Sequence, residues 1–516
     1  MPLEDGRHTI ALVGGAGGIA SHLTSFLKDK SKDIGRVVIL DIPTAQGVAY
    51  AKEIDLADTY DAFGVDIEIV HTSDYEEIKG AEYVVHTAGF PRKPGAPRES
   101  LITTNVPITE TVAKGIKKYA PNAQVFVIAN PLDATVHVTQ EIIGNPNQVI
   151  GMAGVLDSSR LERRIKDRLN LNSHITTLIE EFTTPETQKN IKTKLGLDKD
   201  QPFNVVTISK QLREQYPNIA ECNLVSKLLH DLKIIPKHSY RGNSPFKTSD
   251  VKAYTLGGHG DTMVPVISKA TVKERPLTEQ MILSQKDIED IIQSTRDAGG
   301  QVVTLNNGRG SATQSPAASV FKMLSSYIDA RKGIQQDPLP MTVQVKDKQG
   351  VTGGPLYIGV LATFTPNGGY EVQEVELSAK EAQQFEATIA ANRKLIENTK
   401  KFQNFRDRVD AFINTVRTAP QNFYHSVVTT LLKWGDQELA NSDDFRSRFD
   451  ESRLSTYKGD SVRDKLATCC EQSHLSDQEK KDVLKSYDTA VSPNTQIRHH
   501  RTASVAGVAS VAGAAM

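Results

Sequence analysis

The sequence predicts an α/β fold in which helices cover a doubly wound parallel sheet, and three observations support this prediction. Runs rich in β-branched residues alternate with segments of helical periodicity through residues 1–150. The first run leads into a glycine-rich turn, and the second run ends in an acidic residue. Strands that alternate with helices along a chain pack as a parallel sheet with helices on both faces.

The N-terminal elements follow this alternation. Residues 8–13 (HTIALV) predict the first strand, and residues 14–20 (GGAGGIA) form the turn after it. The next segment has helical spacing. Three of its apolar side chains fall on one face: Leu23, Phe26 and Leu27. Residues 37–40 predict the second strand, which ends at Asp41.

Three further elements continue the pattern. Residues 83–86 predict a strand that leads into the loop 87–98. Residues 125–129 form another apolar run, which ends at Asn130 and a proline. Residues 156–170 (LDSSRLERRIKDRLN) predict a helix. The pattern of a parallel sheet therefore extends to about residue 150.

The composition changes after this helix. Residues 172–250 are polar, and prolines cut them into short pieces. These prolines are Pro185, Pro202, Pro217, Pro236 and Pro245. Residues 251–256 predict a strand that runs into the motif GGHGD. Residues 378–381 (SAKE) form a capping box, which predicts a helix from there to about Lys400.

The remaining residues have a helical periodicity of their own. Apolar side chains recur on one face before Pro420 and again after it. They are Phe402, Phe405, Val409, Phe412, Ile413 and Val416, then Phe423, Val427, Leu431 and Leu432. Residues 476–479 (SDQE) predict another capped helix, and residues 503–516 predict a flexible end.

These changes divide the chain into four parts, and the length of 516 residues fits about three domains of roughly 150 residues each. Residues 1–150 form the parallel-sheet domain. Residues 151–171 and 251–400 form an α+β domain. Residues 172–250 form an insertion of unknown role, and residues 401–516 form a mainly helical C-terminal extension.

Charge and cysteine content exclude several classes of protein. The chain has 61 Lys and Arg against 62 Asp and Glu, so neither nucleic acid nor an anionic membrane is expected as a partner. Cys222, Cys469 and Cys470 are too few for a disulfide framework, and no CxxC or HExxH spacing predicts a metal site. There is no signal-like N-terminus and no apolar run of about 20 residues, so we expect a cytoplasmic protein.

The glycine-rich turn has the spacing of a dinucleotide-binding motif. Gly15, Gly17 and Ala20 lie between a predicted strand and a predicted helix, as the motif requires. Gly15 permits the tight turn, and Gly17 lets the backbone approach a pyrophosphate. Ala20 is small enough for close packing of the helix on the strand. The sequence therefore predicts a Rossmann-type domain.

Asp41 indicates which dinucleotide is bound. It closes the second strand, where a carboxylate can accept hydrogen bonds from the adenosine ribose. The same negative charge repels a 2′-phosphate, and no arginine follows closely enough to reverse that effect. NAD is therefore expected rather than NADP, although an acidic residue at a strand end can also be merely solvated.

Three further motifs carry charged side chains. Arg92 and Arg98 lie in a loop with prolines and glycine, where they can cover an anionic ligand as a lid. Asp157 and Arg160 are three residues apart on one face of a predicted helix. His259 lies between glycines at a strand end, which leaves its imidazole accessible.

At these residues the sequence resembles the malate/lactate dehydrogenase family. The matching segments, in the family's order, are GGAGGIA, the strand ending in Asp41, TAGFPRKPG with the arginine after it, IANPLD, GMAGVLDSSR and GGHGDTMVP. They cover about residues 1–170 and 251–400. The resemblance implies an NAD-binding Rossmann domain, a catalytic and substrate-binding domain, and an oxidoreductase that transfers a hydride to NAD.

The resemblance also implies roles for the charged residues. His259 exchanges a proton with the substrate hydroxyl, and Asp157 fixes its tautomer and stabilises the imidazolium. Arg160 binds the substrate carboxylate through its planar fork. Arg98 polarises the reacting carbonyl as charge develops on it.

The remaining roles concern the substrate and the cofactor. Arg92 matches the position where members that reduce oxaloacetate carry arginine and members that reduce pyruvate carry an uncharged residue. The resemblance therefore implies a malate dehydrogenase of the tricarboxylic acid cycle. Asn130 is expected near both the substrate and the nicotinamide. Besides the motif glycines, alanine and Asp41, the cofactor contacts are expected from Thr87, Ala88, Gly89, Asn105 and Asn130.

The sequence departs from the family pattern in three places. Ala20 replaces a glycine, and Ala96-Pro97 precedes the lid arginine, so lid closure is expected to be stiffer. The third departure is the insertion, since family members join the two catalytic segments by only a few residues. Its two ends must lie close together to leave Asp157 beside His259.

The resemblance leaves two alternatives to malate dehydrogenase. One is a lactate dehydrogenase or another 2-hydroxy acid dehydrogenase, separated by Arg92. The other is an interaction platform on a dehydrogenase core, in which the insertion or the extension binds an unknown protein partner. A homo-dimer or homo-tetramer that binds a small dicarboxylate is expected in the first instance, and no metal site is expected.

Overall fold

The computed structural model describes residues 3–91, 100–181, 184–198, 200–215, 245–279, 283–307 and 310–417, together with Lys481. The chain divides into two compact units. The first unit is Met1–Pro94 with Val112–Arg393, and the second is Gly95–Thr111 with Lys394–Met516. The sheet and the predicted proton-exchanging histidine belong to the first unit.

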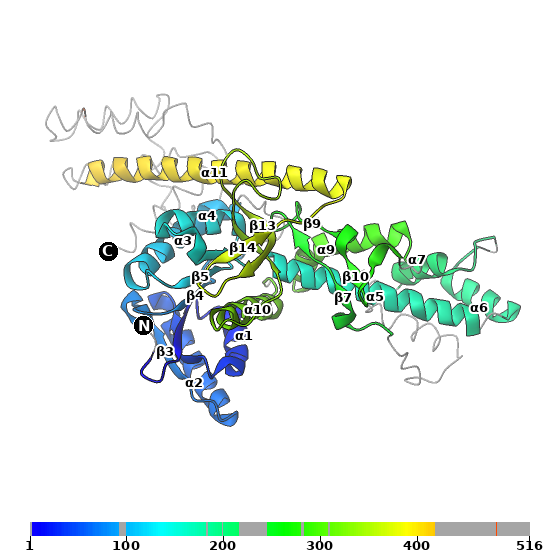
Figure 1. Cartoon of the computed structure of the whole chain (residues 1–516), viewed down its shortest axis with the longest axis horizontal. Helices are drawn as coiled ribbons and strands as arrows, with labels where there is room; N and C mark the ends of the chain where they lie inside the picture. The colour runs from blue at the N-terminus through cyan, green and yellow to red at the C-terminus, as the bar shows by residue number, and fades with distance from the viewer. Residues whose placement is uncertain are drawn as a thin grey trace, which may run out of the picture. The chain divides into compact units, whose positions relative to one another are not determined.

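A parallel sheet of six strands forms the N-terminal part of the first unit (Figure 1). In spatial order the strands are β3 (Glu68–Thr72), β2 (Ile34–Leu40), β1 (His8–Val13), β4 (Tyr83–His86), β5 (Gln124–Val127) and β6 (Val149–Gly151). This is the order of the doubly wound dinucleotide-binding fold, so the predicted fold class is confirmed. The strand order reverses between β1 and β4, and ligands bind at such a point in this fold.

Three antiparallel strands extend the same sheet beyond β6. They are β12 (Leu339–Val345), β13 (Leu356–Phe364) and β14 (Tyr370–Gln373). β12 joins β6 where Thr342 lies opposite Gly151. A Cβ atom on Gly151 would lie 2.9 Å from Thr342 Cβ and 2.7 Å from a methyl group of Val136 in α4 (Leu132–Ile143), so a glycine is needed for this close approach.

Helices cover the sheet, and its inner strands β1, β2, β4, β5 and β6 are therefore almost entirely buried, whereas the edge strands β3 and β14 are partly exposed. They are α1 (Gly18–Leu27), α2 (Gln46–Ala62), α3 (Ser100–Tyr119), α4 (Leu132–Ile143) and α10 (Gln314–Arg331). The predicted apolar face of α1 is confirmed. Leu23 and Leu27 are fully buried, and Phe26 stacks on Phe321 of α10 with 5.6 Å between ring centroids. Figure 1 shows α1 and α10 side by side.

A second hydrophobic core lies around α5 (Gly154–Glu181) and α9 (Gln285–Leu305). Of the short strands in this part of the chain, β7 (Val251–Lys252) and β10 (Thr271–Val272) contribute to it. The others are β8 (Thr255–Leu256), β9 (Val264–Pro265) and β11 (Arg275–Pro276). The buried side chains are Leu161, Ile165, Leu169, Val251, Ala253, Ala270, Val272, Leu277 and Ile291. Single turns of 3-10 helix are found at Lys28–Lys30, Pro43–Ala45, Tyr75–Ile78, Pro146–Gln148, Thr248–Asp250, Ile267–Lys269 and Leu277–Glu279.

The predicted strand at residues 251–256 is wrong in one respect, because it is two strands. At the break, two backbone amides donate to side chains of α5, while the carbonyl of Tyr254 accepts from the amide of Val266 over 3.0 Å. The amide of Ala253 donates to Glu162 Oε1 over 3.3 Å, and the amide of Thr255 donates to Ser158 Oγ over 2.8 Å. These bonds place the chain on α5 just before the GGHGD motif.

The predicted end of α5 at residue 170 is also wrong, since the helix continues to Glu181. Its polar residues there are buried and paired. Asn172 donates to Asp287 Oδ2 over 3.2 Å, and Ser209 Oγ donates to Asn172 Oδ1 over 2.9 Å. Arg168 forms a buried ion pair with Asp287. A polar stretch that suggests a loop in the sequence therefore forms a helix with an internal polar network.

The described residues of the insertion form a small helical substructure on α5. It contains α6 (Pro185–Leu195) and α7 (Val205–Gln215), which lie side by side (Figure 1). Buried apolar side chains fill the space between these elements and α5. These are Ile175, Ile191, Leu195, Leu197, Ile208 and Leu212. Asn170 Nδ2 donates to the carbonyl of Phe246 over 2.9 Å, and the amide of Phe246 donates to Asn170 Oδ1 over 3.1 Å. The two ends of the insertion thus lie together, as predicted.

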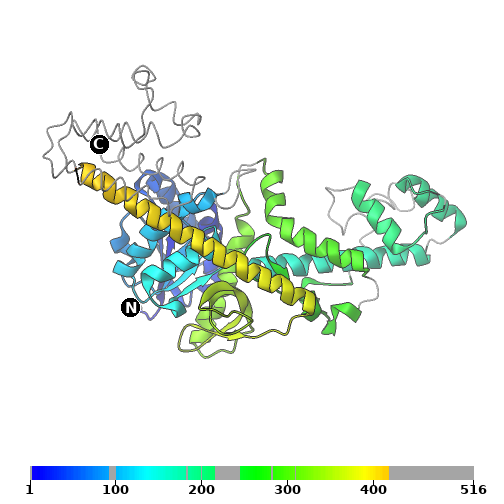
Figure 2. The same cartoon turned by 90° about the horizontal axis from the view of Figure 1, so that it is seen from above.

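The last described helix is α11 (Ala379–Arg417), seen as the long yellow helix in Figure 2. The predicted capping box is confirmed, since the amide of Ser378 donates to Glu381 Oε2 over 3.0 Å and the amide of Glu381 donates to Ser378 Oγ over 3.4 Å. The predicted end at Lys400 is wrong. No glycine or proline interrupts residues 379–417, so the two predicted helical segments form one helix. The predictions for residues 423–432, 476–479 and 503–516 lie outside the described residues.

Candidate active site

Asp157 and His259 form a hydrogen-bonded pair, as the sequence motifs predicted. His259 Nδ1 lies 2.9 Å from Asp157 Oδ2, although 102 residues separate the two in the chain. The Asp157 side chain is 2% exposed, whereas that of His259 is 19% exposed. A buried carboxylate at Nδ1 fixes the imidazole tautomer and stabilises the protonated ring. The other ring nitrogen, Nε2, is then the one suited to proton exchange with a ligand.

Arg160 lies on the same carboxylate, one turn along α5. Its NH1 atom donates to Asp157 Oδ1 over 3.2 Å, and its side chain is 17% exposed. On the α9 side, a Cβ atom added to Gly299 would lie 3.8 Å from the same NH1 atom. A guanidinium has five N–H donors, so Arg160 can bond to Asp157 and to a ligand carboxylate together.

Glycines fix the loop that carries His259. Gly257 has φ of +86° and pairs with Gly359 of β13. The amide of Gly257 donates to the Gly359 carbonyl over 2.8 Å, and the reverse bond is 3.0 Å. A Cβ atom on Gly359 would lie 2.4 Å from the Gly257 oxygen, so a larger residue there would push the loop away.

Two residues that the sequence motifs did not single out also hold this loop. Thr388 Oγ1 of α11 accepts from the amide of Gly258 over 2.9 Å. Asp133 Oδ2 of α4 accepts from the amide of His259 over 3.2 Å. Asp133 belongs to the segment IANPLD, which could have indicated it. Nothing in the sequence around Thr388 relates it to a loop 130 residues earlier.

A second histidine, His86, ends β4 but does not fit the same role. Its side chain is fully buried, and this burial lowers its pKa to about 4. The imidazole is therefore neutral near pH 7 and out of reach of a ligand. Proton exchange is assigned more readily to the partly exposed His259.

The glycine-rich turn lies at the carboxyl end of β1. Gly14 has φ of +82°, and its amide donates to the carbonyl of Leu40 over 2.9 Å. A Cβ atom on Gly14 would lie 2.6 Å from the amide nitrogen of Ala88. Gly17 is the N-cap of α1, and Ala20 is fully buried in that helix. The N-terminus of α1 therefore points into the glycine-rich turn, as predicted. A helix N-terminus of this kind can bind an anion.

Asp41 bonds to the same turn. Its Oδ2 accepts from the amide of Ala16 over 2.9 Å, and its Oδ1 accepts from the amide of Ile42 over 2.8 Å. Lys52 of α2 adds a cation that the sequence motifs missed, since its Nζ donates to the carbonyl of Gly17 over 3.5 Å. Burial lowers the pKa of Lys52, and the negative charge of Asp41 opposes that effect.

The loop after β4 meets the glycine-rich turn. The amide of Thr87 donates to the Val13 carbonyl over 2.8 Å, and its hydroxyl donates to the carbonyls of Val13 and Gly14. Gly89 follows with φ of +155°. The predicted cofactor residues of β1, β2 and β4 thus come together where the strand order reverses. Their backbone cradle and lone acidic side chain fit a dinucleotide.

The other predicted site residues are placed separately. Asn130 is exposed at the end of β5, directly before α4. Asn105 is 1% exposed in the part of α3 that belongs to the second unit. Arg92 and Arg98 lie outside the described residues, as do the three cysteines.

Comparison with known proteins identifies the family. The model of the lactate/malate dehydrogenase NAD-binding domain matches residues 8–151, and that of the family's α/β C-terminal domain matches residues 237–403. A malate dehydrogenase from Citrifermentans bemidjiense is 33% identical over 404 residues, which are 76% of this chain and 99% of that protein. This chain belongs to the lactate/malate dehydrogenase family. NAD is accordingly its cofactor, and it is an oxidoreductase.

Solved structures of this family include enzymes with both substrates. The crystal structure of Cryptosporidium parvum malate dehydrogenase has 29% sequence identity and a TM-score of 0.56, and it covers 76% of this chain and 99% of that one. The lactate dehydrogenase from the same organism, complexed with lactic acid and NAD, has 27% identity and a TM-score of 0.56, with 76% and 98% covered. The likeness is thus divided between malate and lactate enzymes.

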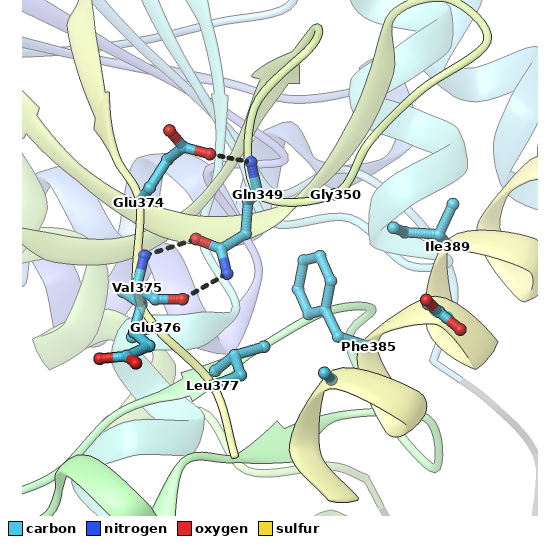
Figure 3. A pocket seen from close by; sticks show the side chains of 10 residues that line it. Gln349, Gly350, Glu374, Val375, Glu376, Leu377, Phe385 and Ile389 are labelled. Atoms are coloured by element: carbon cyan, nitrogen blue, oxygen red, sulfur yellow. Dashed lines mark hydrogen bonds between the residues drawn. The ribbon is translucent and has the colours of Figure 1, made fainter. Parts of the chain in front are cut away.

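A separate cavity of about 520 Å³ opens between residues 349–350, the chain after β14 and the start of α11 (Figure 3). Phe385, Leu377 and Ile389 supply apolar lining, and Glu374, Glu376 and Glu386 supply acidic groups. Gln349 bonds to the backbone of Val375 with both side-chain atoms, 2.6 and 2.9 Å (Figure 3). No residue of the dehydrogenase site lines this cavity.

The described part of the chain has neither a membrane-spanning helix nor a metal-binding cluster. None of its helices is long and apolar enough to cross a membrane. Within the same residues, no group of three or more His, Cys, Asp or Glu side chains is arranged to hold a metal ion.

Proposed function

We propose that this dehydrogenase acts on malate, transferring a hydride reversibly between malate and NAD to give oxaloacetate and NADH. The observation that carries the proposal is the arrangement of Asp157, which bonds to His259 through one oxygen and to Arg160 through the other. A proton-exchanging group and a carboxylate-binding group are thereby held side by side. Oxidation of a 2-hydroxy acid requires both.

The proposed roles follow from the chemistry of malate oxidation. His259 Nε2 takes the hydroxyl proton, and Asp157 stabilises the imidazolium that forms. Arg160 binds the carboxylate next to the reacting carbon in a bidentate manner. NAD, when bound, accepts the hydride from the same carbon. Arg98 and Asn130 are proposed to bond to the reacting oxygen.

The choice of malate over lactate is proposed to depend on Arg92. Malate and oxaloacetate carry a second carboxylate, which needs a second cation in a closed site. With pyruvate or lactate, Arg92 would be desolvated without a partner, at a cost of several kcal/mol. Lactate dehydrogenase is the second candidate, because the solved lactate dehydrogenase from Cryptosporidium parvum shares the fold at 27% identity.

The test is to compare substrates with the full-length protein. NADH oxidation is followed with oxaloacetate and with pyruvate over the same concentration range, and with NADPH in place of NADH. We expect a higher kcat/KM for oxaloacetate and a strong preference for NADH. A higher kcat/KM for pyruvate would overturn the malate assignment and favour the lactate alternative.

The assembly is a further proposal. We infer a homo-dimer or homo-tetramer with no obligatory partner, and the helical insertion offers an additional surface for a protein. Light scattering of the purified chain measures its mass in solution. A monomer that is fully active would contradict the proposed assembly.

A further inference from the structure

We propose that Thr388 and Asp133 are positioning residues for His259, which clamp two consecutive amides of its loop from two different helices. Thr388 on α11 holds the amide of Gly258 at 2.9 Å, and Asp133 on α4 holds the amide of His259 at 3.2 Å. The proposal rests on the proposed function, since it gives these residues a purpose only if His259 exchanges protons with the substrate.

Thr388 is buried and committed to this loop. Its side chain is fully buried, and its hydroxyl accepts from Gly258 while donating to Thr262 Oγ1 over 3.0 Å. A threonine in a helix usually bonds to a carbonyl of the preceding turn. Here the hydroxyl bonds instead to Gly258, within the GGHGD motif, and to Thr262, directly after it. Its donor and its acceptor capacity are therefore both used to fix the loop.

The loop has glycines where α11 approaches it. A Cβ atom on Gly257 would lie 2.8 Å from the Thr388 methyl group. A Cβ atom on Gly258 would lie 2.9 Å from Asn392 Oδ1 and 3.1 Å from Thr388 Oγ1. Asn392 is itself anchored, since its Nδ2 donates to the carbonyl of Tyr357 over 3.2 Å. The helix thus contacts the loop backbone directly.

Asp133, on α4, holds the second amide of the loop, that of His259. Its side chain is 3% exposed, and its second oxygen, Oδ1, lies 3.5 Å from the Thr342 hydroxyl, which donates to it. A buried carboxylate that accepts from a backbone amide makes a stronger hydrogen bond than a neutral acceptor. The backbone of His259 is therefore fixed relative to α4, which begins directly after Asn130 and Pro131.

The clamp matters because Asp157 and His259 belong to different elements. Their 2.9 Å contact exists only if the loop stays at a fixed distance from α5. A displacement of about 1 Å in a catalytic group can lower the rate on the order of a hundredfold. Loss of either anchor should therefore lower kcat without changing how the distant glycine-rich turn binds NADH.

The decisive variant is Thr388→Val, which keeps the shape and removes the hydroxyl. We expect kcat for oxaloacetate reduction to fall on the order of tenfold to a hundredfold with an unchanged KM for NADH. Thr388→Ser keeps the hydroxyl and should restore most of kcat. The matched control is Thr399→Val, because Thr399 is a buried threonine of the same helix whose hydroxyl donates to the Leu395 carbonyl. A wild-type kcat in Thr388→Val, or an equal loss in Thr388→Ser, would overturn the proposal.

Amide hydrogen exchange tests the clamp independently of the proposed malate dehydrogenase activity. The amide of Gly258 should exchange faster in Thr388→Val and at the wild-type rate in Thr388→Ser, whatever the activity. A wild-type chain that oxidises no 2-hydroxy acid would refute the function, whereas unchanged Gly258 exchange would refute the clamp. If Thr388→Val does not fold, Asp133→Asn is measured in the same way at the amide of His259, and wild-type exchange there with wild-type kcat would overturn the proposal.

Discussion

At the scale of single residues, the site depends on the placement of one buried carboxylate. Asp157 is 2% exposed, yet it contacts a guanidinium through one oxygen and an imidazole through the other. A buried charge is costly unless cations and hydrogen bonds surround it. Asp157 therefore both orients His259 and holds Arg160, which makes its charge the most informative one to remove.

Replacing Asp157 by Asn should lower kcat strongly and leave the fold intact. The amide has the same shape, but it cannot stabilise an imidazolium and can present the wrong group to Nδ1. By comparison with the aspartate of a serine-protease triad, we expect a loss on the order of 10²- to 10⁴-fold. Steady-state kinetics measure the loss, and Asp167→Asn on the same helix is the control. A kcat within twofold of wild type, taken as a rough limit on experimental error, would exclude a role in proton exchange.

Replacing Arg92 by Gln should shift the preference from oxaloacetate towards pyruvate. The substitution removes the cation proposed to pair with the second carboxylate and the desolvation penalty that pyruvate would face. A ratio of kcat/KM values changed by about tenfold to a hundredfold corresponds to about 1.4–2.8 kcal/mol. Both substrates are assayed with the same NADH concentration. An unchanged ratio would mean that Arg92 has another role.

At the scale of elements, α11 is held at its first turn by a carboxylate with several donors. Glu381 accepts from the amide of Ser378 over 3.0 Å and from that of Ser268 over 3.0 Å. Burial raises the pKa of Glu381, but hydrogen bonds from Ser268 and Ser378 outweigh it, so the pKa lies below its usual value. This residue joins the start of α11 to the chain that follows the GGHGD loop.

Glu381→Gln should therefore destabilise the protein by about 1 kcal/mol at neutral pH, as loss of a helix cap does. Because the folded pKa is lowered, the stabilisation is present above the unfolded pKa of about 4.3 and is lost as pH falls through the folded pKa. Thermal unfolding of both proteins at pH 7 and below pH 4 measures the difference. Glu386→Gln, at an exposed position of α11, is the control. A difference that persists unchanged in acid would contradict the assignment.

The elements also show how far the sequence could predict this molecule. Local patterns were sufficient for β1, β4 and the Asp157–Arg160 spacing, since each depends on neighbouring residues. They failed at residues 251–256 and after residue 170, where side chains such as Glu162 and Asp287 supply partners that are distant in sequence. Thr388 could not be predicted for the same reason, because its hydroxyl bonds to a loop 130 residues away.

At the scale of the whole molecule, the chain adds material to a complete dehydrogenase. The first family model matches residues 8–151, and the second matches residues 237–403. The insertion, residues 172–250, lies mostly between these two matches. Asn170 and Phe246 hold its ends together, so it leaves the Asp157–His259 pair in place. The C-terminal addition differs, because α11 continues into it without interruption to Arg417.

Two truncations should separate the contribution of α11 from that of the residues after Arg417. Removing residues 418–516 should preserve activity and thermal stability, because the described contacts of α11, including those of Phe402 and Gln403, are retained. Removing residues 401–516 should destabilise the protein, because it deletes Phe402, which is 1% exposed, and Gln403, which donates to Glu110 Oε1 over 2.8 Å. Loss of one buried phenylalanine side chain costs about 3–5 kcal/mol. Thermal unfolding, oxaloacetate reduction and solution mass are measured for both.

Point variants make the same comparison without shortening the chain. Phe402→Ala should reproduce much of the destabilisation caused by removing residues 401–516. Asn404→Ala, at an exposed position two residues on, should not. If the two truncations were equally stable, α11 beyond residue 400 would contribute nothing to folding. If removal of residues 418–516 changed the mass in solution but not the stability, the residues after Arg417 would act in assembly rather than in the fold. The extension would then be a determinant of assembly attached to an enzyme whose proposed catalytic groups precede it.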